Sequence, residues 1–424
     1  MNGPARLWEN IASLSTLQAL NYAVPLATVP YLVRVLGSAQ FGLLSFAQAL
    51  IIYFDLIADY GFNLSATRAV AAHRHEPDLL ARIFWRTLSA KTVLMLASAL
   101  VLAILVGAIP RLRETPLLYA AAFLTVVGTV TFPVWFFQGI EQMKYLTIAQ
   151  SSARLLTVPA LMLFVRQPDH YLRAAVIQGA VPLLASLLIA PVLWRKLPHG
   201  SYLPRLREVL AAMREGWHVF IVNTSLVINA STATVVLGFV AGNVEVGYYS
   251  AADKVVRAVT SLLTPITQAL YPHLNSLKAR SAGMAFRLMR RSYGWILLAA
   301  GAASLATFLL APPVGRLLWG DAFIPSIAVL RCLSPLPVLL ALVNIIGTQT
   351  MLVFEMDAQA SRILLLCAAI NVPLAAGLSG SMGALGAASA TVGTALLTVL
   401  SLSWGLRRHR VVLWRAISEN TCVP

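Results

Sequence analysis

The chain has 424 residues, of which 58% are hydrophobic and only 11% are charged, and its formal net charge is +16. Its mean hydropathy is +0.77. Soluble globular domains carry about 25% charged residues. The composition therefore excludes a soluble protein and predicts one that lies mostly within a lipid bilayer.

Apolar segments long enough to cross a bilayer follow one another along the whole chain. A spanning helix needs about 20 mostly apolar residues, and we expect about twelve of them. They lie near residues 11–36, 41–58, 87–108, 116–139, 145–165, 173–194, 217–241, 247–271, 292–311, 322–351, 361–379 and 383–405. The first segment lacks the compact apolar core and small-residue cleavage site of a signal peptide, so we expect a retained helix.

Lysine and arginine collect in alternate loops, which the positive-inside rule places in the cytoplasm. These loops hold Arg68, Arg74, Arg82, Arg86, Arg195, Lys196, Arg205, Arg207, Arg214, Lys278, Arg280, Arg287, Arg290, Arg291, Arg407, Arg408, Arg410 and Arg415. The other loops hold only Arg111, Arg113, Arg166 and Arg316. Both termini are therefore predicted to be cytoplasmic. Contact with anionic headgroups of membrane lipids accounts for the basic charge, so nucleic acid is not an expected partner.

The sequence carries no recognisable enzymatic motif. It has no G-x-x-x-x-G-K-[ST], since Ala90 precedes Lys91 and Thr92, and it has no H-E-x-x-H. The three cysteines, Cys332, Cys367 and Cys422, are too few and too scattered for a disulfide framework or a zinc site. We expect a protein that is not an enzyme and binds neither a metal nor a cofactor.

An internal repeat divides the chain near its middle. At an offset of 205 residues the pattern G-x4-G-x2-S-x-A recurs, pairing Gly37, Gly42, Ser45 and Ala47 with Gly242, Gly247, Ser250 and Ala252. Arg154 and Arg362 align at nearly the same offset. Chance similarity between glycine- and alanine-rich helices is the alternative. Copies separated by six helices share one orientation, which predicts two six-helix bundles related by a pseudo-twofold axis around a central cavity.

The predicted domain boundaries follow from this repeat. We expect an N-terminal bundle over residues 1–196, a basic cytoplasmic linker over 197–216, and a C-terminal bundle with a short basic tail over 217–424. Transporters of this build rock one bundle against the other.

Cations within the predicted spans are candidates for the substrate site, because a charge at the bilayer centre needs a functional reason. The candidates are Arg34, Arg154, Lys254, Arg257 and Arg331. Arg34 lies near the outer end of its span, where an interfacial anchor is the alternative, and Lys91 is expected to be such an anchor. Buried acids are few, so the predicted cavity suits an anion rather than a cationic drug.

Acidic and amide side chains in the spans complete the candidate set. Asp55, Asp59 and Asp253 are candidates for ion coupling or gating. For Asp59 we favour a structural role, either capping or an ion pair that involves Asn63 and Arg68. Amides that can meet sugar hydroxyls are Gln18, Asn21, Gln48, Asn223 and Asn229, with hydrogen bonding between helices as the alternative for each.

Two stretches strongly resemble the start of bacterial O-antigen and polysaccharide-repeat flippases, the Wzx-type members of the MOP superfamily. They are TVPYLVRVLGSAQFGLLSFAQAL from Thr28 to Leu50 and DYGFNLSATRAVA from Asp59 to Ala71. WFFQGIEQMKYLTIAQ, from Trp135 to Gln150, resembles the family's junction between the fourth and fifth helices.

The resemblance implies an inner-membrane flippase that carries an undecaprenyl-pyrophosphate-linked oligosaccharide from the cytoplasmic to the periplasmic leaflet. It implies that the cavity cations receive pyrophosphate or acidic sugars, and a complex with a polysaccharide polymerase and a chain-length regulator is a further expectation. Two rivals are an ion-coupled multidrug-type antiporter and a membrane glycosyltransferase, polymerase or ligase. The shortage of buried acids disfavours the first, and the short outer loops disfavour the second.

Overall fold

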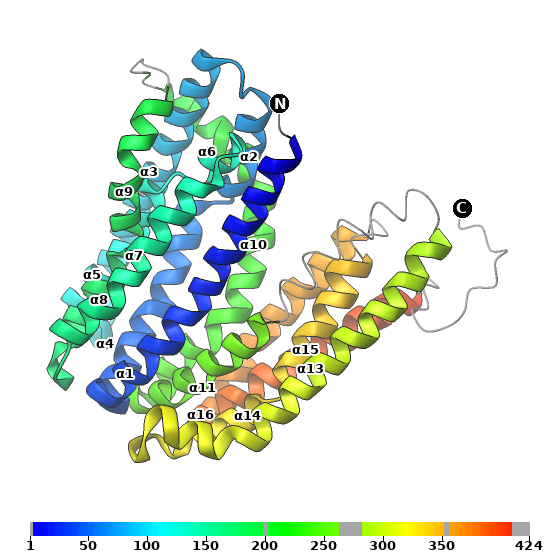
Figure 1. The fold of residues 1–424 in the computed structure, drawn as a ribbon. Helices are drawn as coiled ribbons and strands as arrows, with labels where there is room; N and C mark the ends of the chain where they lie inside the picture. The colour runs from blue at the N-terminus through cyan, green and yellow to red at the C-terminus, as the bar shows by residue number, and fades with distance from the viewer. Residues whose placement is uncertain (1–2, 198–201, 203, 263–281, 352–355, 409–424) are drawn as a thin grey trace. The chain divides into compact units, whose positions relative to one another are not determined.

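The computed structural model describes residues 3–197, 202, 204–262, 282–351 and 356–408; for some of them, including 3–23 and 282–291, it describes only the backbone. Over these residues the chain forms helices and no strands (Figure 1). The first helices are α1 (Gly3–Asp59), α2 (Phe62–Ala72), α3 (Pro77–Ala108), α4 (Pro110–Arg113), α5 (Pro116–Thr131), α6 (Val134–Gly139), α7 (Met143–Phe164), η1 (Pro168–His170), α8 (Tyr171–Gly179) and α9 (Val181–Lys196).

The later helices are α10 (Leu206–Ala241), α11 (Asn243–Ser261), α13 (Ala282–Trp319), η2 (Asp321–Phe323), α14 (Pro325–Leu333), α15 (Leu336–Val343), the π-helix η3 (Asn344–Met351) and α16 (Asp357–Arg408). Eight helical segments of the described chain are long and apolar enough to cross a membrane. Two of these, of 49 and 51 residues, each exceed twice the length that one crossing needs. The prediction of an all-helical, multi-pass membrane protein is confirmed, whereas the count of twelve spans and the orientation remain predictions.

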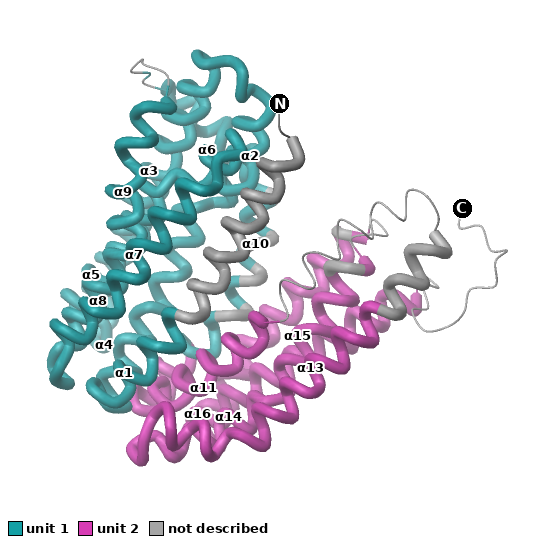
Figure 2. The backbone as a smooth tube through the Cα atoms, in the orientation of Figure 1, with its two compact units in different colours: residues 1–235 teal, residues 236–424 magenta. Residues whose placement is uncertain are grey.

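The chain packs as two compact units, residues 1–235 and residues 236–424 (Figure 2). Unit 1 contains α1 to α9 and most of α10, and unit 2 contains the end of α10 and the helices from α11 to α16. The division falls inside α10, beyond the predicted linker over residues 197–216. The helix that opens the second predicted bundle therefore packs largely within unit 1.

The two copies of the sequence repeat share a backbone conformation. Gly37 interrupts α1 with φ 72° and ψ 176°, and Gly242 precedes α11 with φ 93° and ψ 179°. Glycine alone occupies this region without strain. Figure 1 shows α1 reversing direction at its interruption, so that one continuous helix assignment holds two of the predicted spans.

Burial also agrees between the copies. Ala47 and Ala252 are fully buried, and the hydroxyls of Ser45 and Ser250 are both buried without a hydrogen-bond partner. The alternative that the repeat is a chance similarity does not account for this agreement in conformation and environment.

Prolines break some predicted spans and leave others continuous. The predicted spans at 116–139 and 322–351 are interrupted at Pro133 and at Pro335, where no backbone N–H is available to continue the helix. Pro25 and Pro30 lie inside α1, and Pro373 lies inside α16, without ending either helix. Membrane helices tolerate such prolines because neighbouring groups satisfy the freed carbonyls.

An aromatic core fills one end of unit 1. Phe84 of α3 contacts Trp135 and Phe136 of α6 at ring-centroid distances of 5.4 and 5.5 Å. A Cβ atom on Gly139 would lie 2.4 Å from Cγ1 of Val70, so α2 and α6 approach too closely for any other residue. The stretch from Trp135 to Gly139, which resembles a known family, therefore serves packing.

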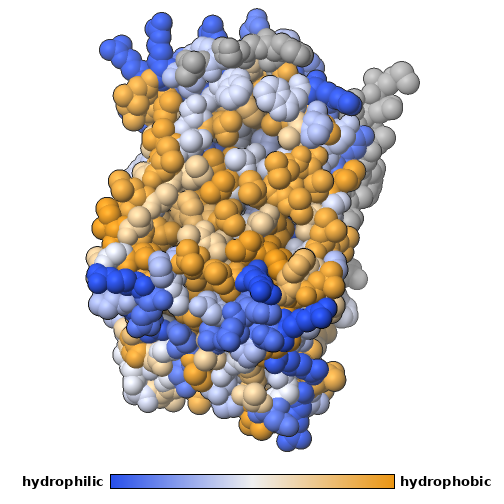
Figure 3. Space-filling view, turned by 90° about the vertical axis from the view of Figure 1, so that its left-hand side faces the viewer, coloured by the Kyte–Doolittle hydropathy of each residue, from blue (hydrophilic) through white to orange (hydrophobic). Residues whose placement is uncertain are grey.

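A broad apolar band covers the outer surface of unit 1. Figure 3 shows it between polar regions above and below. Its exposed side chains come from α3, α5, α7, α8 and α9, and include Leu96, Leu100, Ile104, Leu117, Leu155, Leu163, Val176 and Leu187. A surface of this kind is stable only in contact with lipid.

Candidate functional site

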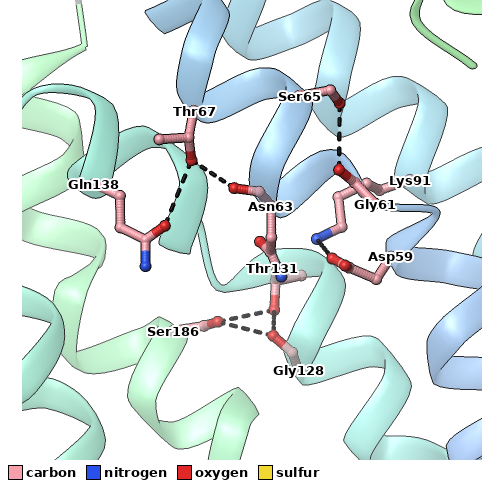
Figure 4. Close-up of polar contacts among 10 residues, drawn as sticks. All are labelled: Asp59, Gly61, Asn63, Ser65, Thr67, Lys91, Gly128, Thr131, Gln138 and Ser186. Atoms are coloured by element: carbon pink, nitrogen blue, oxygen red, sulfur yellow. Dashed lines mark hydrogen bonds and ion pairs between the residues drawn. The ribbon is translucent and has the colours of Figure 1, made fainter. Parts of the chain in front are cut away.

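A buried ion pair joins α1 to α3 in unit 1. Nζ of Lys91 donates to Oδ1 of Asp59 at 2.9 Å, and the side chain of Lys91 is fully buried while that of Asp59 is 16% exposed (Figure 4). The expectation that Lys91 anchors the protein at the membrane interface is wrong, because the carboxylate draws the ammonium group inward. Asp59 forms an ion pair, as in the structural role that we favoured, but its partner is Lys91 rather than Arg68, and its role stays a prediction.

Further hydrogen bonds link α2, α5, α6 and α9 around this ion pair. Oγ1 of Thr67 donates to the carbonyl oxygen of Trp135 at 3.2 Å, which ties α2 to α6. The hydroxyl of Ser186 on α9 lies 3.0 Å from that of Thr131 on α5 and donates to the carbonyl oxygen of Gly128 at 3.3 Å (Figure 4). These contacts satisfy polar groups within the helix bundle, which indicates a structural role.

Asp55 lies one helical turn before Asp59 and faces the same neighbours. It is hydrogen bonded to Thr129 of α5, and its Oδ1 atom is buried without a hydrogen-bond partner. Since Lys91 binds Asp59, no second cation is bound to Asp55 in the part of the chain that the structure describes. Asp55 is thus the buried carboxyl group of unit 1 with unused hydrogen-bonding capacity.

Two polar side chains on one face of α7 have unused hydrogen-bonding atoms at membrane depth. Oγ of Ser151 and Nε of Arg154 are buried and have no hydrogen-bond partner in the part of the chain that the structure describes. By contrast, the hydroxyls of Thr147 and Thr157 on the same helix donate to the carbonyl oxygens of Met143 and Ala153. Within the described residues no carboxylate lies within 4 Å of Arg154, so its guanidinium group is available to an anion.

The depth of Arg154 in the membrane makes a guanidinium group without a nearby described carboxylate unusual. It lies ten residues before the end of α7 at Phe164, which is about 15 Å along a helix that rises 1.5 Å per residue. A guanidinium group at that depth must face water, a partner or a ligand.

Amide and hydroxyl groups form bridges between other helices of unit 1. Nε2 of Gln48 on α1 donates to Oε1 of Gln178 on α8 at 2.7 Å, and Nε2 of Gln178 is buried without an acceptor. The hydroxyls of Tyr53 and Thr232 lie 3.0 Å apart and join α1 to α10. The side chains of Gln18, Asn21, Asn223 and Asn229 lie outside the described set, and their assignment as glycan contacts stays a prediction.

In unit 2, α11 carries a second ion pair between side chains of one helix. Nε of Arg257 lies 2.5 Å from Oδ2 of Asp253, one helical turn earlier. The Asp253 side chain is 13% exposed, but that of Arg257 is 47% exposed. Lys254 is half-buried beside them. Lys254 and Arg257 therefore lie on one helix, as predicted, and Asp253 of the same helix binds Arg257.

The remaining predicted cations lie near helix ends. Arg34 is exposed three residues before the turn at Gly37. Arg331 is exposed on α14, and its guanidinium carbon lies 5.4 Å from the centre of the Phe308 ring of α13. Arg34 and Arg154 belong to unit 1, and the other three cations belong to unit 2. The predicted five-cation cavity stays a prediction.

Sequence reasoning missed two residues that organise these sites. Gln178, which accepts from Gln48, carries only the weak signal of an amide in an apolar segment. Glu245, at the start of α11, accepts from the backbone N–H of Ala384 at 2.7 Å, next to the turn at Gly383 in α16. An acid three residues after the repeat glycine Gly242 is the signal that identifies it.

Comparison with known proteins relates this architecture to transporters. Residues 7–278 match the family described as Polysaccharide biosynthesis protein. A relative from Escherichia coli (strain K12), named as an O-antigen transporter, is 30% identical over 407 residues, which cover 96% of this chain and 98% of the relative. A relative of the same name from Shigella dysenteriae is 27% identical over 397 residues, with 92% and 98% covered.

Solved structures resemble the chain over almost its whole length. The lipid II flippase MurJ, in an inward closed conformation, gives a TM-score of 0.72 at 10% identity and covers 93% of this chain and 87% of its own. A multidrug resistance MATE family transporter of the MOP superfamily, in an inward-facing conformation, gives 0.64 at 16% identity, with 92% and 94% covered. At these identities the likeness concerns the fold.

Proposed function

Because the chain belongs to the polysaccharide biosynthesis protein family, we propose that it is a flippase for a lipid-linked oligosaccharide. It moves an undecaprenyl-pyrophosphate-linked repeat unit from the cytoplasmic to the periplasmic leaflet of a bacterial inner membrane, and it does so by alternating access. It transports its cargo without chemical change and is not an enzyme. The observation that carries the proposal is Arg154, a guanidinium group at membrane depth whose Nε has no hydrogen-bond partner among the described residues.

Arg154 receives the pyrophosphate of the cargo. Arginine presents forked donors that match phosphate oxygens, and the hydroxyl of Ser151 on the same face of α7 offers one more donor. A buried donor without an acceptor costs about 1–3 kcal/mol. A ligand rich in acceptor oxygens removes that cost, which is why the arrangement favours an anionic cargo over a cationic drug.

The cations of unit 2 take part in a water-filled path. Arg257 lies fourteen residues into α11, about 21 Å from its start, and its side chain is 47% exposed. A half-exposed guanidinium group at that depth faces water rather than hydrocarbon. Lys254, Arg331 and Arg34 extend this positive path toward the ends of the spans, and the amides at 18, 21, 48, 223 and 229 contact sugar hydroxyls.

The membrane potential supplies a direction for transport. Each negative charge of the cargo that moves outward gains about 2.3 kcal/mol per 100 mV of inside-negative potential. The protein supplies the polar path, while the lipid tail stays in the bilayer.

Asp55 is the residue that couples an ion to the return of the transporter to its inward-facing state. Its buried Oδ1 atom has no partner, whereas Asp59 and Asp253 are bound to Lys91 and Arg257. Asp59 and Asp253 act instead by holding their cations. We extend the proposal to a complex with a polysaccharide polymerase and a chain-length regulator, because those activities consume a repeat unit that has reached the outer leaflet.

The test compares two changes on α7 in a strain that lacks the native gene. Arg154→Gln should abolish the transfer of complete lipid-linked repeat units to the outer leaflet, measured by their accessibility in spheroplasts, while leaving the amount of protein in the membrane unchanged. Thr157→Ala, whose hydroxyl donates to the carbonyl oxygen of Ala153 on the same helix, should support normal transfer.

Three outcomes would contradict the proposal. Normal transfer by the Arg154→Gln variant would remove Arg154 from the cargo site. Repeat units that reach the outer leaflet in the deletion strain but stay unpolymerised would indicate a polymerase or ligase. Unchanged glycans, together with ion-coupled uptake of cationic dyes by the purified protein, would indicate a multidrug antiporter.

A further inference from the structure

Helix α10 belongs to one repeat by sequence and packs with the other. Gly242 corresponds to Gly37, so α10, which ends just before Gly242, corresponds to the first arm of α1. The first arm of α1 packs within its own unit, where the hydroxyl of Tyr31 donates to the carbonyl oxygen of Val165 at 2.7 Å. Helix α10 instead packs within unit 1 as far as Val235.

Close backbone contacts seat α10 on the turn between α1 and α2. A Cβ atom on Gly61 would lie 2.7 Å from Cγ1 of Val219, and one on Gly216 would lie 2.9 Å from the carbonyl oxygen of Tyr60. The rings of Tyr60 and Phe220 stack with their centroids 4.6 Å apart. Glycine on both sides thus lets α10 and this turn approach closely.

A small apolar cluster continues the contact toward the start of α10. Its buried members are Phe62 of α2, Ala90 and Leu94 of α3, and Val209 and Ala212 of α10.

Charged and aromatic side chains then fasten the first part of α10, and Tyr202 before it, to the start of α3. We call these five residues the linker clasp: Arg82, Arg86, Tyr202, Glu208 and Glu215. The guanidinium carbon of Arg82 lies 5.4 Å from the centre of the Tyr202 ring. The Tyr202 hydroxyl donates to Glu208, which also accepts from the backbone N–H of Arg205 at 2.7 Å. Arg86 donates to both carboxylate oxygens of Glu215, at 3.0 and 3.4 Å.

The linker clasp is made of contacts that water weakens. The side chains of Arg86 and Glu215 are 24% and 53% exposed, in contrast to the fully buried Lys91. Exposed ion pairs and cation–π contacts are individually weak. These contacts therefore break at a lower cost than the buried cluster and the close glycine contacts that also hold α10.

We propose that the linker clasp is a releasable latch, which holds α10 on unit 1 in one state of the transport cycle and opens when α10 moves with the second bundle. The inference rests on the proposed function, since alternating access requires the two bundles to separate at the side where the cargo enters. The linker is the covalent connection between the bundles. Separation of the bundles therefore acts first on the linker clasp, which ties the linker to α3.

The experiment locks the latch reversibly. In a protein without its native cysteines, Arg86→Cys and Glu215→Cys are combined and bridged by a bifunctional methanethiosulfonate, because an arginine–glutamate pair spans more than a disulfide can. The bridge should form in native membranes, detected by the faster migration of the cross-linked chain. It should stop transfer of the repeat unit, and reduction should restore transfer.

The matched control is the exposed ion pair Arg74–Glu141, whose nitrogen–oxygen distance is also 3.0 Å and which does not involve α10. Arg74→Cys with Glu141→Cys, bridged in the same way, should leave transfer intact. Full transfer by the protein bridged at positions 86 and 215 would overturn the proposal, and so would failure of that bridge to form while the control bridge forms.

Failure of the proposed function gives a different result. In that case the reduced protein transfers no repeat unit, although the bridge at positions 86 and 215 still forms and can be reversed.

Discussion

Two ion pairs, one in each unit, differ in burial and in the helices that they join. In unit 1, Lys91 and Asp59 are 0% and 16% exposed, and they join two different helices. In unit 2, Arg257 and Asp253 are 47% and 13% exposed, and they lie on the same helix. The first pair holds α1 against α3. The second orients a guanidinium group that still reaches solvent, so the comparison contrasts a buried pair between helices with a half-exposed pair within one helix.

The largest expected effect comes from breaking the buried pair. Lys91→Met leaves Asp59 buried and uncompensated, which should lower the free energy of unfolding by about 3–5 kcal/mol. Asp59→Leu combined with Lys91→Met removes both charges and should recover most of the loss. The measurement is denaturant or thermal unfolding of the purified protein in detergent. Equal destabilisation by the single and double changes would mean that the pair does not act as a unit.

A smaller effect on stability, with a large effect on transport, is expected in unit 2. Arg257→Gln removes a half-exposed pair within one helix and should change the free energy of unfolding by less than about 1 kcal/mol. It should nevertheless abolish transfer of the repeat unit, because the cargo loses a cation at membrane depth. Spheroplast accessibility measures transfer, and unfolding of the same preparation measures stability. A strongly destabilised protein would place Arg257 with Lys91 among the structural charges.

The smallest expected effect concerns Glu208, a carboxylate that lies in water. The hydrogen bonds from Tyr202 and from the N–H of Arg205 lower the pKa of Glu208. A lowered folded-state pKa stabilises the contact above the ordinary glutamate pKa, and that stabilisation is lost as the pH falls through the lowered value.

The same hydrogen bond raises the pKa of Tyr202. Glu208→Gln should therefore move the ionisation of Tyr202 to lower pH. The measurement is ultraviolet titration of each protein against its Tyr202→Phe counterpart, and an unchanged ionisation would show that the contact is absent in solution.

The repeat was the part of the tertiary fold that could be predicted best. Gly37 and Gly242 were paired from spacing alone, and they share one backbone conformation that glycine alone adopts without strain. The ends of the spans were predicted less well, because a proline by itself does not determine where a membrane helix ends. Helix α14 ends just before Pro335, whereas α16 continues through Pro373. The difference depends on which neighbouring groups satisfy the carbonyl oxygens that each proline leaves without a donor.

The site was predicted as a set of residue types rather than as a set of contacts. The search for charges in apolar segments found Asp59, Arg154 and Arg257, because such charges are rare in membrane helices. It could not assign Lys91 to Asp59, since the two lie 32 residues apart and meet only when α3 packs against α1. It also could not distinguish the hydroxyl of Ser151, which has no partner among the described residues, from that of Thr157, which donates to Ala153.

By itself the sequence determined that this protein is helical, crosses a membrane many times and carries a repeat, because hydropathy and glycine spacing act locally along the chain. Only the tertiary structure decided that α10 packs with unit 1 and that one intramembrane cation is bound by an acid while another is not. Those outcomes depend on which helices touch, and side-chain partners are chosen by packing between segments that are distant in the sequence.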